Sequence, residues 1–202
     1  MLKFCLAIIS GVGLLMSVGD SKAITYNIDT NHSTVGFATP ILGGLSKVRG
    51  KFTDFAVTIN HDESDMSRSS VTAKIKATSI DTGIEKRDEH LRTSDFFDVT
   101  KFPEINFQSK RVEKHGKAFV AIGDFTMHGV TKEIALPFTI TGKHVGKDDK
   151  TGEKLVNTGY SIRWKLNRQD YGISWRHSVD PNFIGDEIEI EINLITKATV
   201  VK

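Results

Sequence analysis

Three residues near the N-terminus have the types of a nucleophilic catalytic triad: Asp29, His32 and Ser33. Triads are assembled in space, and three members at the start of one strand rarely reach the required alignment. The chain also has no Gly-x-Ser-x-Gly elbow, no glycine-rich phosphate loop and no His-Glu-x-x-His pair. We therefore expect Asp29 and Ser33 to tie down a strand and its turn, and we predict that the protein is not an enzyme.

The residues that could bind a metal ion are scattered. No two histidines have metal-ligand spacing on one predicted element, and no cysteine lies near them. We expect no metal site and no catalytic cofactor. The seven histidines are His32, His61, His90, His115, His128, His144 and His177.

The first 23 residues have the layout of a secretory signal peptide. Lys3 precedes an apolar run from Phe4 to Val18, and Ser21-Lys22-Ala23 places small residues at positions −3 and −1. The run is too short to anchor the chain in a bilayer. We predict cleavage after Ala23, which removes residues 1–23 and leaves 24–202 as a single domain.

Composition limits the location and the partners of the remaining chain. The only cysteine, Cys5, leaves with the signal peptide, and an exported protein without disulfides suits a bacterial periplasm. The 27 basic and 25 acidic residues nearly balance, at a net charge of +2, and no basic stripe is interleaved with aromatic residues. Nucleic acid is therefore not an expected partner. Monomer and homodimer both stay open.

Alternation of apolar and polar residues with a period of two dominates the sequence. It is clearest in Glu187–Leu194, where acidic or polar residues alternate with aliphatic ones, as is typical of a half-buried antiparallel strand. His128-Gly129 predicts a tight hairpin, and Gly146 to Gly152 predicts a longer hairpin loop. We expect about eight strands in one all-β domain. The other expected strand segments are Thr25–Asp29, Ser33–Ala38, Phe55–Ile59, Val71–Ala77, Ile105–Gln108, Phe119–Met127, Thr131–Gly142 and Tyr160–Leu166.

One segment breaks the alternation. Thr82 and Glu85 have the spacing of a helix capping box, and good helix formers without β-branched residues follow them. We predict a short helix in a connection between strands, near residues 83–92. Leu45–Arg49 is expected to form a second short helical turn.

Eight antiparallel strands can close into a barrel or stack as a sandwich, and periodicity does not choose between them. The residues expected to face the interior are rich in phenylalanine and include Tyr160 and Trp164. Such a set would line an apolar tube or fill an ordinary dry core. From composition and periodicity, both interpretations stay open.

Several short motifs follow one another in a specific order and spacing along most of the chain after residue 23. They are Asp29-x-x-His32-Ser33, Phe37, Val48-Arg49-Gly50-x-Phe52, Ile80–Gly83, Arg87–Arg92, Asp95–Asp98, Phe102-Pro103-x-Ile105-x-Phe107, Gly123–Lys132, Arg168-x-x-Tyr171-Gly172-Ile173 and Gly185–Ile188. This series resembles the YceI-like family of periplasmic polyisoprenoid-binding proteins. Tyr171 departs from the family, which often has Phe there, and the loop from Val145 to Leu155 is longer than usual.

The resemblance implies a lipocalin-like antiparallel barrel with a polyisoprenoid or quinone-type lipid inside it, held for storage or transport, with transient contact to a membrane. The helix would lie at one end of the tube, where His32, Arg87 and His90 are candidate head-group contacts. Of the adjacent pair Phe96 and Phe97, we expect Phe97 to point inward and Phe96 to seal the helix against the barrel. A fatty-acyl ligand, or a secreted β-sandwich interaction module with a dry core, is the alternative. The residues expected to line the tube are Phe37, Phe55, Val57, Ile75, Leu91, Phe97, Phe107, Phe119, Phe125, Phe138, Tyr160, Ile162, Trp164 and Ile190.

Overall fold

The computed structural model describes residues 24–62, 64–148 and 151–200. The predicted signal peptide and its cleavage site lie outside these residues. The strands are β1 (Ile24–Ile28), β2 (Thr34–Ile41), β3 (Ser46–Phe52), β4 (Phe55–His61), β5 (Ser70–Lys76), β6 (Ile80–Asp81), β7 (Glu104–His115), β8 (Ala118–Met127), β9 (Val130–Lys147), β10 (Lys154–Asn167) and β11 (Glu187–Val200). The helix α1 spans Glu85–Arg92, and short 3₁₀ turns are η1 (Thr30–His32), η2 (Leu42–Gly44), η3 (Met66–Arg68), η4 (Ala77–Ser79) and η5 (Arg168–Tyr171).

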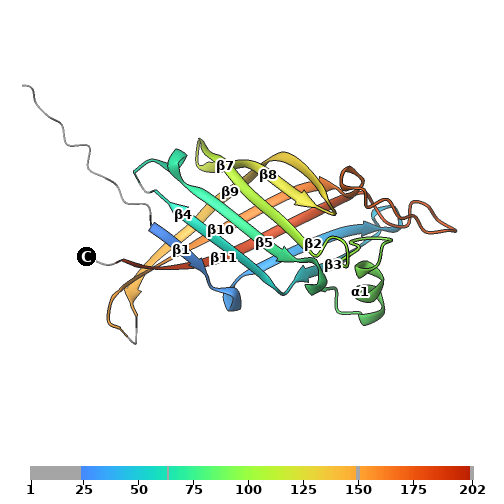
Figure 1. The fold of residues 1–202 in the computed structure, drawn as a ribbon, viewed down its shortest axis with the longest axis horizontal. Helices are drawn as coiled ribbons and strands as arrows, with labels where there is room; N and C mark the ends of the chain where they lie inside the picture. The colour runs from blue at the N-terminus through green and yellow to red at the C-terminus, as the bar shows by residue number, and fades with distance from the viewer. Residues whose placement is uncertain (1–23, 63, 149–150, 201–202) are drawn as a thin grey trace, which may run out of the picture.

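Eight of these strands close into an antiparallel barrel (Figure 1). Their order around the ring is β1, β4, β5, β7, β8, β9, β10 and β11, and β11 returns to β1 through the pair Asn27 and Lys197. The predicted all-β barrel is therefore confirmed, and the sandwich is wrong. Closure pairs both edges of the sheet, which removes the exposed strand edges that a sandwich keeps.

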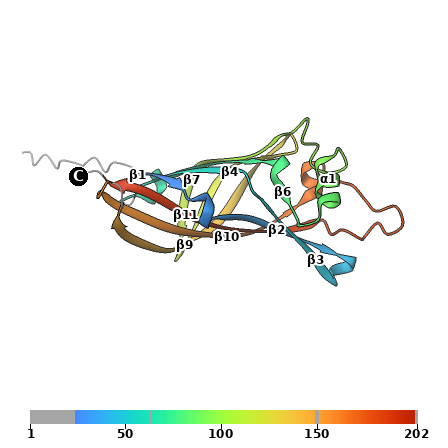
Figure 2. The same cartoon turned by 90° about the horizontal axis from the view of Figure 1, so that it is seen from below.

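Three further strands, β2, β3 and β6, extend the same sheet at one end of the barrel. β2 continues along the edge of β11 beyond β1, β3 pairs with β2, and the two-residue β6 pairs with β3. Figures 1 and 2 show β2, β3 and α1 at the end of the barrel opposite the C-terminus. We call this end the α1 end. The irregular connection between β10 and β11 lies at the same end (Figure 1).

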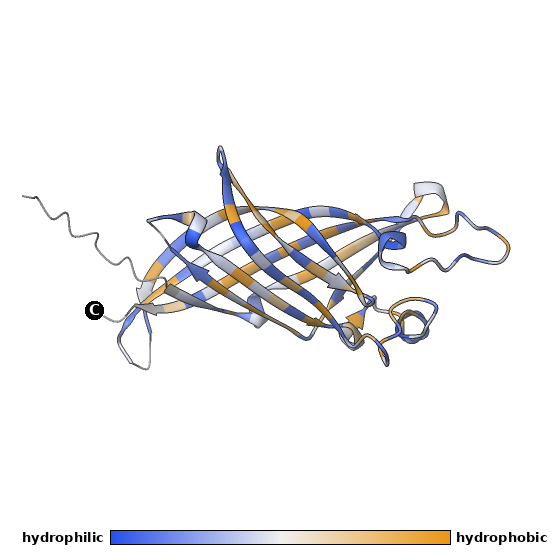
Figure 3. Cartoon of the chain, turned by 45° about the horizontal axis from the view of Figure 1, so that its top comes forward, coloured by the Kyte–Doolittle hydropathy of each residue, from blue (hydrophilic) through white to orange (hydrophobic). Residues whose placement is uncertain are grey.

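The strands form where the alternation predicted them, because each one separates water from an apolar interior. In β4, Phe55, Val57 and Ile59 are buried, whereas Ala56 and Thr58 are exposed. Figure 3 shows the same alternation of hydrophilic and hydrophobic residues along neighbouring strands. Side chains on successive residues of a strand point to opposite faces, so this sequence period forms a barrel wall.

The predicted hairpin at His128-Gly129 is confirmed. Both residues have positive φ, 50° and 75°, which is the backbone of a two-residue turn that matches the twist of the flanking strands β8 and β9. Glycine at the second position allows the positive φ, and it also leaves room for a neighbouring ring. A Cβ atom on Gly129 would lie 2.4 Å from the ring of Phe102.

The helix in the predicted connection is confirmed, but its cap is different. α1 begins at Glu85 after the N-cap Ile84, which makes no side-chain cap hydrogen bond. The predicted capping box is wrong, because Gly83, at φ 78°, turns the chain between Thr82 and the helix. Thr82 instead donates its backbone N–H and its hydroxyl to the carboxylate of Asp88.

The second predicted helical turn, Leu45–Arg49, is wrong. These residues fall mostly in β3, whose ladder with β2 includes the pair Thr39 and Val48. The 3₁₀ turn comes just before it, at Leu42–Gly44. Across the part of the chain that the structure describes, no helix has the length and apolarity needed to cross a membrane.

Candidate functional site

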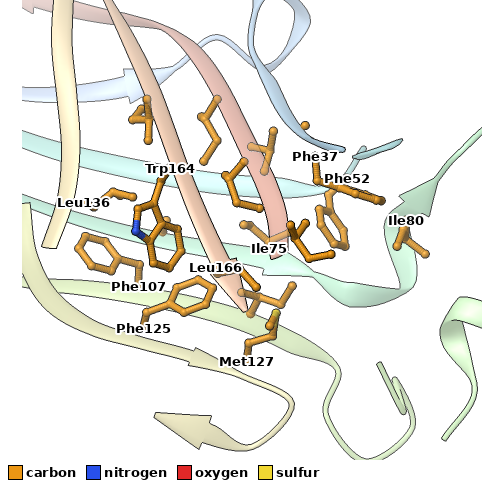
Figure 4. A pocket seen from close by; sticks show the side chains of 18 of the residues that line it. Phe37, Phe52, Ile75, Ile80, Phe107, Phe125, Met127, Leu136, Trp164 and Leu166 are labelled. Carbon is orange, nitrogen blue, oxygen red and sulfur yellow. The ribbon is translucent and has the colours of Figure 1, made fainter. Parts of the chain in front are cut away.

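A cavity of about 580 Å³ occupies the interior of the barrel. Inward-facing side chains of β4, β5 and β7 to β11 form its wall, and β2, β3 and β6 complete the wall at the α1 end. Most of these side chains are aliphatic or aromatic. Figure 4 shows Trp164, Phe107, Phe125 and Leu136 on one side of the space, with Phe37, Phe52 and Ile80 toward the α1 end.

Most of the residues expected to line the tube do line it. The members of that set along the cavity are Phe37, Val57, Ile75, Leu91, Phe97, Phe107, Phe125, Phe138, Tyr160, Ile162, Trp164 and Ile190. Whether they contact a ligand stays a prediction. The positions of the strand residues in this set follow from the period of two, which assigns a whole row of side chains to the interior once one member is placed. Leu91 and Phe97 lie in α1 and the turn after it, outside this pattern.

Phe55 and Phe119 do not line the cavity, and for these two the expectation is wrong. Phe55 is buried in the packed part of the core at the first position of β4, opposite Ile75. Phe119 stacks on Phe138 with a centroid distance of 5.4 Å and packs against the cluster that contains Val112 and Ala121. Both rings therefore fill space between the strands and leave the open part of the cavity to their neighbours.

Three polar side chains of α1 reach the cavity: Lys86, Arg87 and His90. The guanidinium of Arg87 is held in place, because its Nε donates to Thr82 Oγ1 at 2.7 Å and its Nη2 donates to the carbonyl of Thr82 at 2.9 Å. The Nε2 of His90 lies 2.7 Å from a carboxylate oxygen of Asp95. Two of the three predicted head-group contacts thus lie at the cavity mouth, on one short helix.

His32 is the exception among those three. Its side chain is 73% exposed in the turn between β1 and β2, and it is not part of the cavity wall. The turn lies beside β11 on the outside of the barrel, where the imidazole Nδ1 lies 3.0 Å from Asp29. His32 therefore does not pack at an end of the cavity, and its predicted contact with a head group gains no support from this position.

The triad-like residues around His32 are structural. The hydroxyl of Ser33 accepts a hydrogen bond from the backbone N–H of Ile195 at 2.9 Å, which ties the β1–β2 turn to β11. Asp29 lies 2.7 Å from the ammonium of Lys197, and this contact, together with that of His32, holds the pKa of the Asp29 carboxyl at about 2. The expected role of Asp29 and Ser33 in fixing the strand and turn is confirmed.

Phe96 and Phe97 both line the cavity. The expectation that only Phe97 points inward assumed a regular element, in which adjacent side chains diverge. The two residues instead lie in the turn after α1, where Phe97 donates its backbone N–H to Leu91. Phe97 packs edge-on against Phe52, and Phe96 packs edge-on against His90.

The connection from β10 to β11 forms part of the mouth, which the sequence patterns did not reveal. Arg168, Ile173, Trp175, Phe183 and Ile184 line the cavity from this connection. The ring of Trp175 meets His90 edge-on at 5.3 Å and lies 5.3 Å from Phe96. No period marks such residues, although Arg168 and Ile173 stand in one of the segments that resemble the family.

The opposite end of the cavity has a second polar group. The Nδ1 of His61 lies 3.2 Å from the hydroxyl of Tyr160, and both side chains line the cavity. Ser69 and Ser70 contribute from the start of β5 and the turn before it. The cavity is therefore apolar along its length and polar at both ends.

This arrangement suits a long apolar molecule with a small polar group. Among the described residues, no three His, Cys, Asp or Glu side chains cluster closely enough to hold a metal ion. Ligands of such pockets are held mainly by apolar contact, with a few polar groups that fix their orientation.

Comparisons with known proteins agree with the geometry. A family model described as a YceI-like domain matches residues 26–196. The YceI protein of Shigella flexneri is 37% identical over 163 residues, which cover 79% of this chain and 82% of the relative. Two solved structures share the fold at low identity. BcnA of Burkholderia cenocepacia has a TM-score of 0.70 and 18% identity, covering 83% of this chain and 98% of that one. A polyisoprenoid-binding domain from Saccharophagus degradans has a TM-score of 0.63 and 13% identity, covering 87% of this chain and 99% of that one.

Proposed function

The chain belongs to the YceI-like family, and from this premise we propose that it is a periplasmic binding protein that holds the chain of a polyisoprenoid lipid inside its barrel. One observation carries the proposal: an apolar cavity of about 580 Å³ runs through the barrel of this chain. A structural neighbour with the same fold is described as a polyisoprenoid-binding domain, which supports an isoprenoid as the ligand class.

The energetics favour a chain-like ligand. Burial of one CH₂ group contributes about 0.8 kcal/mol, so a twenty-carbon tail gains roughly 16 kcal/mol before the costs of association. Ordering and lost translation offset a large share of that gain. Because the wall is mostly apolar, affinity depends on shape and apolar area, and lipids of similar width should compete.

We propose a quinone-type head for this ligand, placed at the mouth of the cavity. The mouth carries the donors Lys86, Arg87 and His90, and carbonyl oxygens of a quinone accept such hydrogen bonds. A fatty-acyl ligand is the alternative, since its carboxylate or amide would use the same donors. The protein acts in this proposal as a carrier or store and not as an enzyme.

The predicted signal peptide supports a periplasmic location, where a lipid carrier would exchange its ligand with a membrane through transient contact. The rival function, an interaction module with a dry core, fits the structure less well because that module needs no cavity. In such a module, side chains from opposite walls would meet across the interior and leave no open space.

Mass spectrometry of an organic extract tests the proposal. The mature protein, residues 24–202, is purified without detergent and extracted. An apolar species in stoichiometric amount, with the mass spacing of isoprene units, is the expected result. A fatty chain would keep the carrier and change the ligand class. If the extract contains no lipid, even after the protein is incubated with quinone-loaded vesicles, the result would favour the interaction module.

A further inference from the structure

Exposed aliphatic side chains gather around the mouth of the barrel. Among the described residues, the exposed large apolar side chains are Leu42 (45%), Leu45 (87%), Ile84 (53%), Val145 (52%) and Val179 (86%). All of them except Val145 belong to the α1 end, where they come from three separate connections. We call Leu42, Leu45, Ile84 and Val179 the apolar rim.

The rim is continuous with the cavity wall. Ile84 is both exposed and part of the wall, and Ile41, which precedes Leu42, also lines the cavity. Phe183 and Ile184 line it from the connection that carries Val179. An apolar path therefore leads from the interior of the barrel to the exposed tips.

Backbone hydrogen bonds tie two of these three connections together. The N–H of Leu42 donates to the carbonyl of Phe183 at 2.9 Å, and the N–H of Gly185 donates to the carbonyl of Pro40 at 2.8 Å. Leu42 itself has a φ of 52°, a conformation that residues with a side chain rarely adopt, and this turn keeps its side chain exposed. The β2–β3 turn and the β10–β11 connection thus form one platform.

The turn that carries Leu42 and Leu45 is also basic. From Pro40 to Lys51 the chain has Lys47, Arg49 and Lys51 and no acidic residue. Lys47 is bound to Glu189 at 2.7 Å and Lys51 lies 4.0 Å from Asp81, whereas Arg49 lies exposed behind the apolar tip. Cations next to exposed aliphatic residues are the combination that binds an anionic bilayer surface.

From these observations we propose that the apolar rim docks the mouth of the barrel onto an anionic lipid bilayer, so that a lipid chain passes between membrane and cavity without crossing water. The inference rests on the proposed function for the nature of its cargo. A protein partner fits less well, because binding surfaces for proteins concentrate energy in packed aromatic and arginine side chains. Separate aliphatic tips suit a fluid surface that deforms around each of them.

Sedimentation with vesicles tests docking without any cargo. Vesicles of phosphatidylethanolamine and phosphatidylglycerol in a 3:1 ratio are compared with vesicles of phosphatidylcholine alone. The double variant Leu45→Ser with Val179→Ser should partition about tenfold more weakly, since two aliphatic side chains no longer enter the interface. Val145→Ser removes an exposed aliphatic side chain outside the rim, although a less exposed one at 52%, and should behave like the wild type.

Arg49→Gln tests the electrostatic part separately. It should weaken partitioning onto the anionic vesicles about fivefold and leave the weak partitioning onto phosphatidylcholine unchanged. Equal partitioning of the wild type and the double variant would overturn the proposal, as would failure of the wild type to sediment with either kind of vesicle. The proposal would also be overturned if the wild type is a dimer and the double variant is a monomer, because the rim would then bind a second copy of the chain.

Transfer of ubiquinone links the rim to the proposed function. Uptake from donor vesicles should fall about tenfold in the double variant, whereas uptake of ubiquinone delivered from ethanol should stay unchanged. If the wild type takes up no lipid from either source, the proposed function fails. The sedimentation result still shows whether the rim docks onto a bilayer. If both kinds of uptake fall equally, the rim acts on the cavity and the docking proposal is wrong.

Discussion

The buried guanidinium of Arg168 lies 2.9 Å from the carboxylate of Asp186, and the two residues stand at opposite ends of the connection between β10 and β11. The same guanidinium donates to the carbonyls of Ile173, Trp175 and Gly185. One side chain therefore organises the irregular segment that forms part of the mouth. Its own position is fixed because its side chain is 4% exposed at the end of β10.

Arg168→Met should therefore destabilise the protein strongly. The variant leaves three carbonyls without their donor and removes a buried partner of Asp186, so we expect a loss of about 3 kcal/mol in the free energy of unfolding. Arg163→Met removes an exposed residue of β10 that pairs with Glu191 of β11, and this change should cost less than about 1 kcal/mol. Urea unfolding of both variants measures the difference, and equal losses would contradict the proposed role of Arg168.

Stability at low pH should depend on Asp29. The pKa of this carboxyl is about 2 in the folded protein, against a reference value of 3.8, chiefly because of the contact with Lys197. A carboxyl with a lowered pKa stabilises the folded state fully above the reference value, and this contribution is lost as the pH falls through about 2. Because Lys197 and His32 are exposed to solvent, screening reduces the stabilisation that this shift represents to about 1 kcal/mol.

Asp29→Asn should thus lower the free energy of unfolding by about 1 kcal/mol at pH 7, and the gap to the wild type should close near pH 2. Denaturant titrations at several pH values between 7 and 2 provide the measurement. Asp170→Asn, at an exposed ion pair with Lys132, should change stability by less than about 0.5 kcal/mol. A gap for Asp29→Asn that stays constant with pH would show that the carboxylate contributes through geometry and not through charge.

Filling the cavity should prevent lipid uptake and leave the barrel intact. Ala73 of β5 lines the cavity between Val57 and Phe107 of the neighbouring strands, so Ala73→Phe places a ring in open space. Overpacking a dry core typically costs about 1–3 kcal/mol, but here we expect a change below about 1 kcal/mol and at least a tenfold loss of ubiquinone uptake. Ala56→Phe adds the same atoms to the exposed face of β4 and serves as the control. Strong destabilisation by Ala73→Phe with unchanged uptake would favour a dry core.

The barrel wall was the part of the molecule that the sequence predicted best. In segments such as Glu187–Leu194 the period of two is a direct consequence of a wall with water on one side. In this segment only Ile190 was predicted to line the cavity, although Ile188, Ile192 and Leu194 line it in the same row. Extending the period along the whole strand would have found them.

The mouth could not be predicted in the same way, because its residues are placed by tertiary contacts. Trp175 belongs to no regular element, and it reaches the cavity because Arg168 binds its carbonyl and His90 meets its ring. The prediction that Phe119 lines the cavity was wrong for a related reason. Alternation assigns a ring to the interior, but whether that ring faces open space or fills it depends on neighbours such as Phe138.

The two tryptophans of the chain, Trp164 and Trp175, both line the cavity and can report the position of the ligand. Trp175 lies at the mouth beside His90, whereas Trp164 lies within β10, roughly 10 Å from the end of that strand. A quinone ring quenches indole fluorescence at short range. If the head group of the ligand binds to Arg87 and His90, ubiquinone should quench Trp175 more strongly than Trp164.

Single-tryptophan variants separate the two signals. Trp164→Phe leaves only Trp175, and Trp175→Phe leaves only Trp164, with an aromatic ring kept at each position. Stronger quenching of Trp164 would contradict a head group at the mouth and would place it deeper, toward His61 and Tyr160 at the far end of the cavity. The orientation matters for transfer, because a head group at the mouth leaves the membrane last and returns to it first.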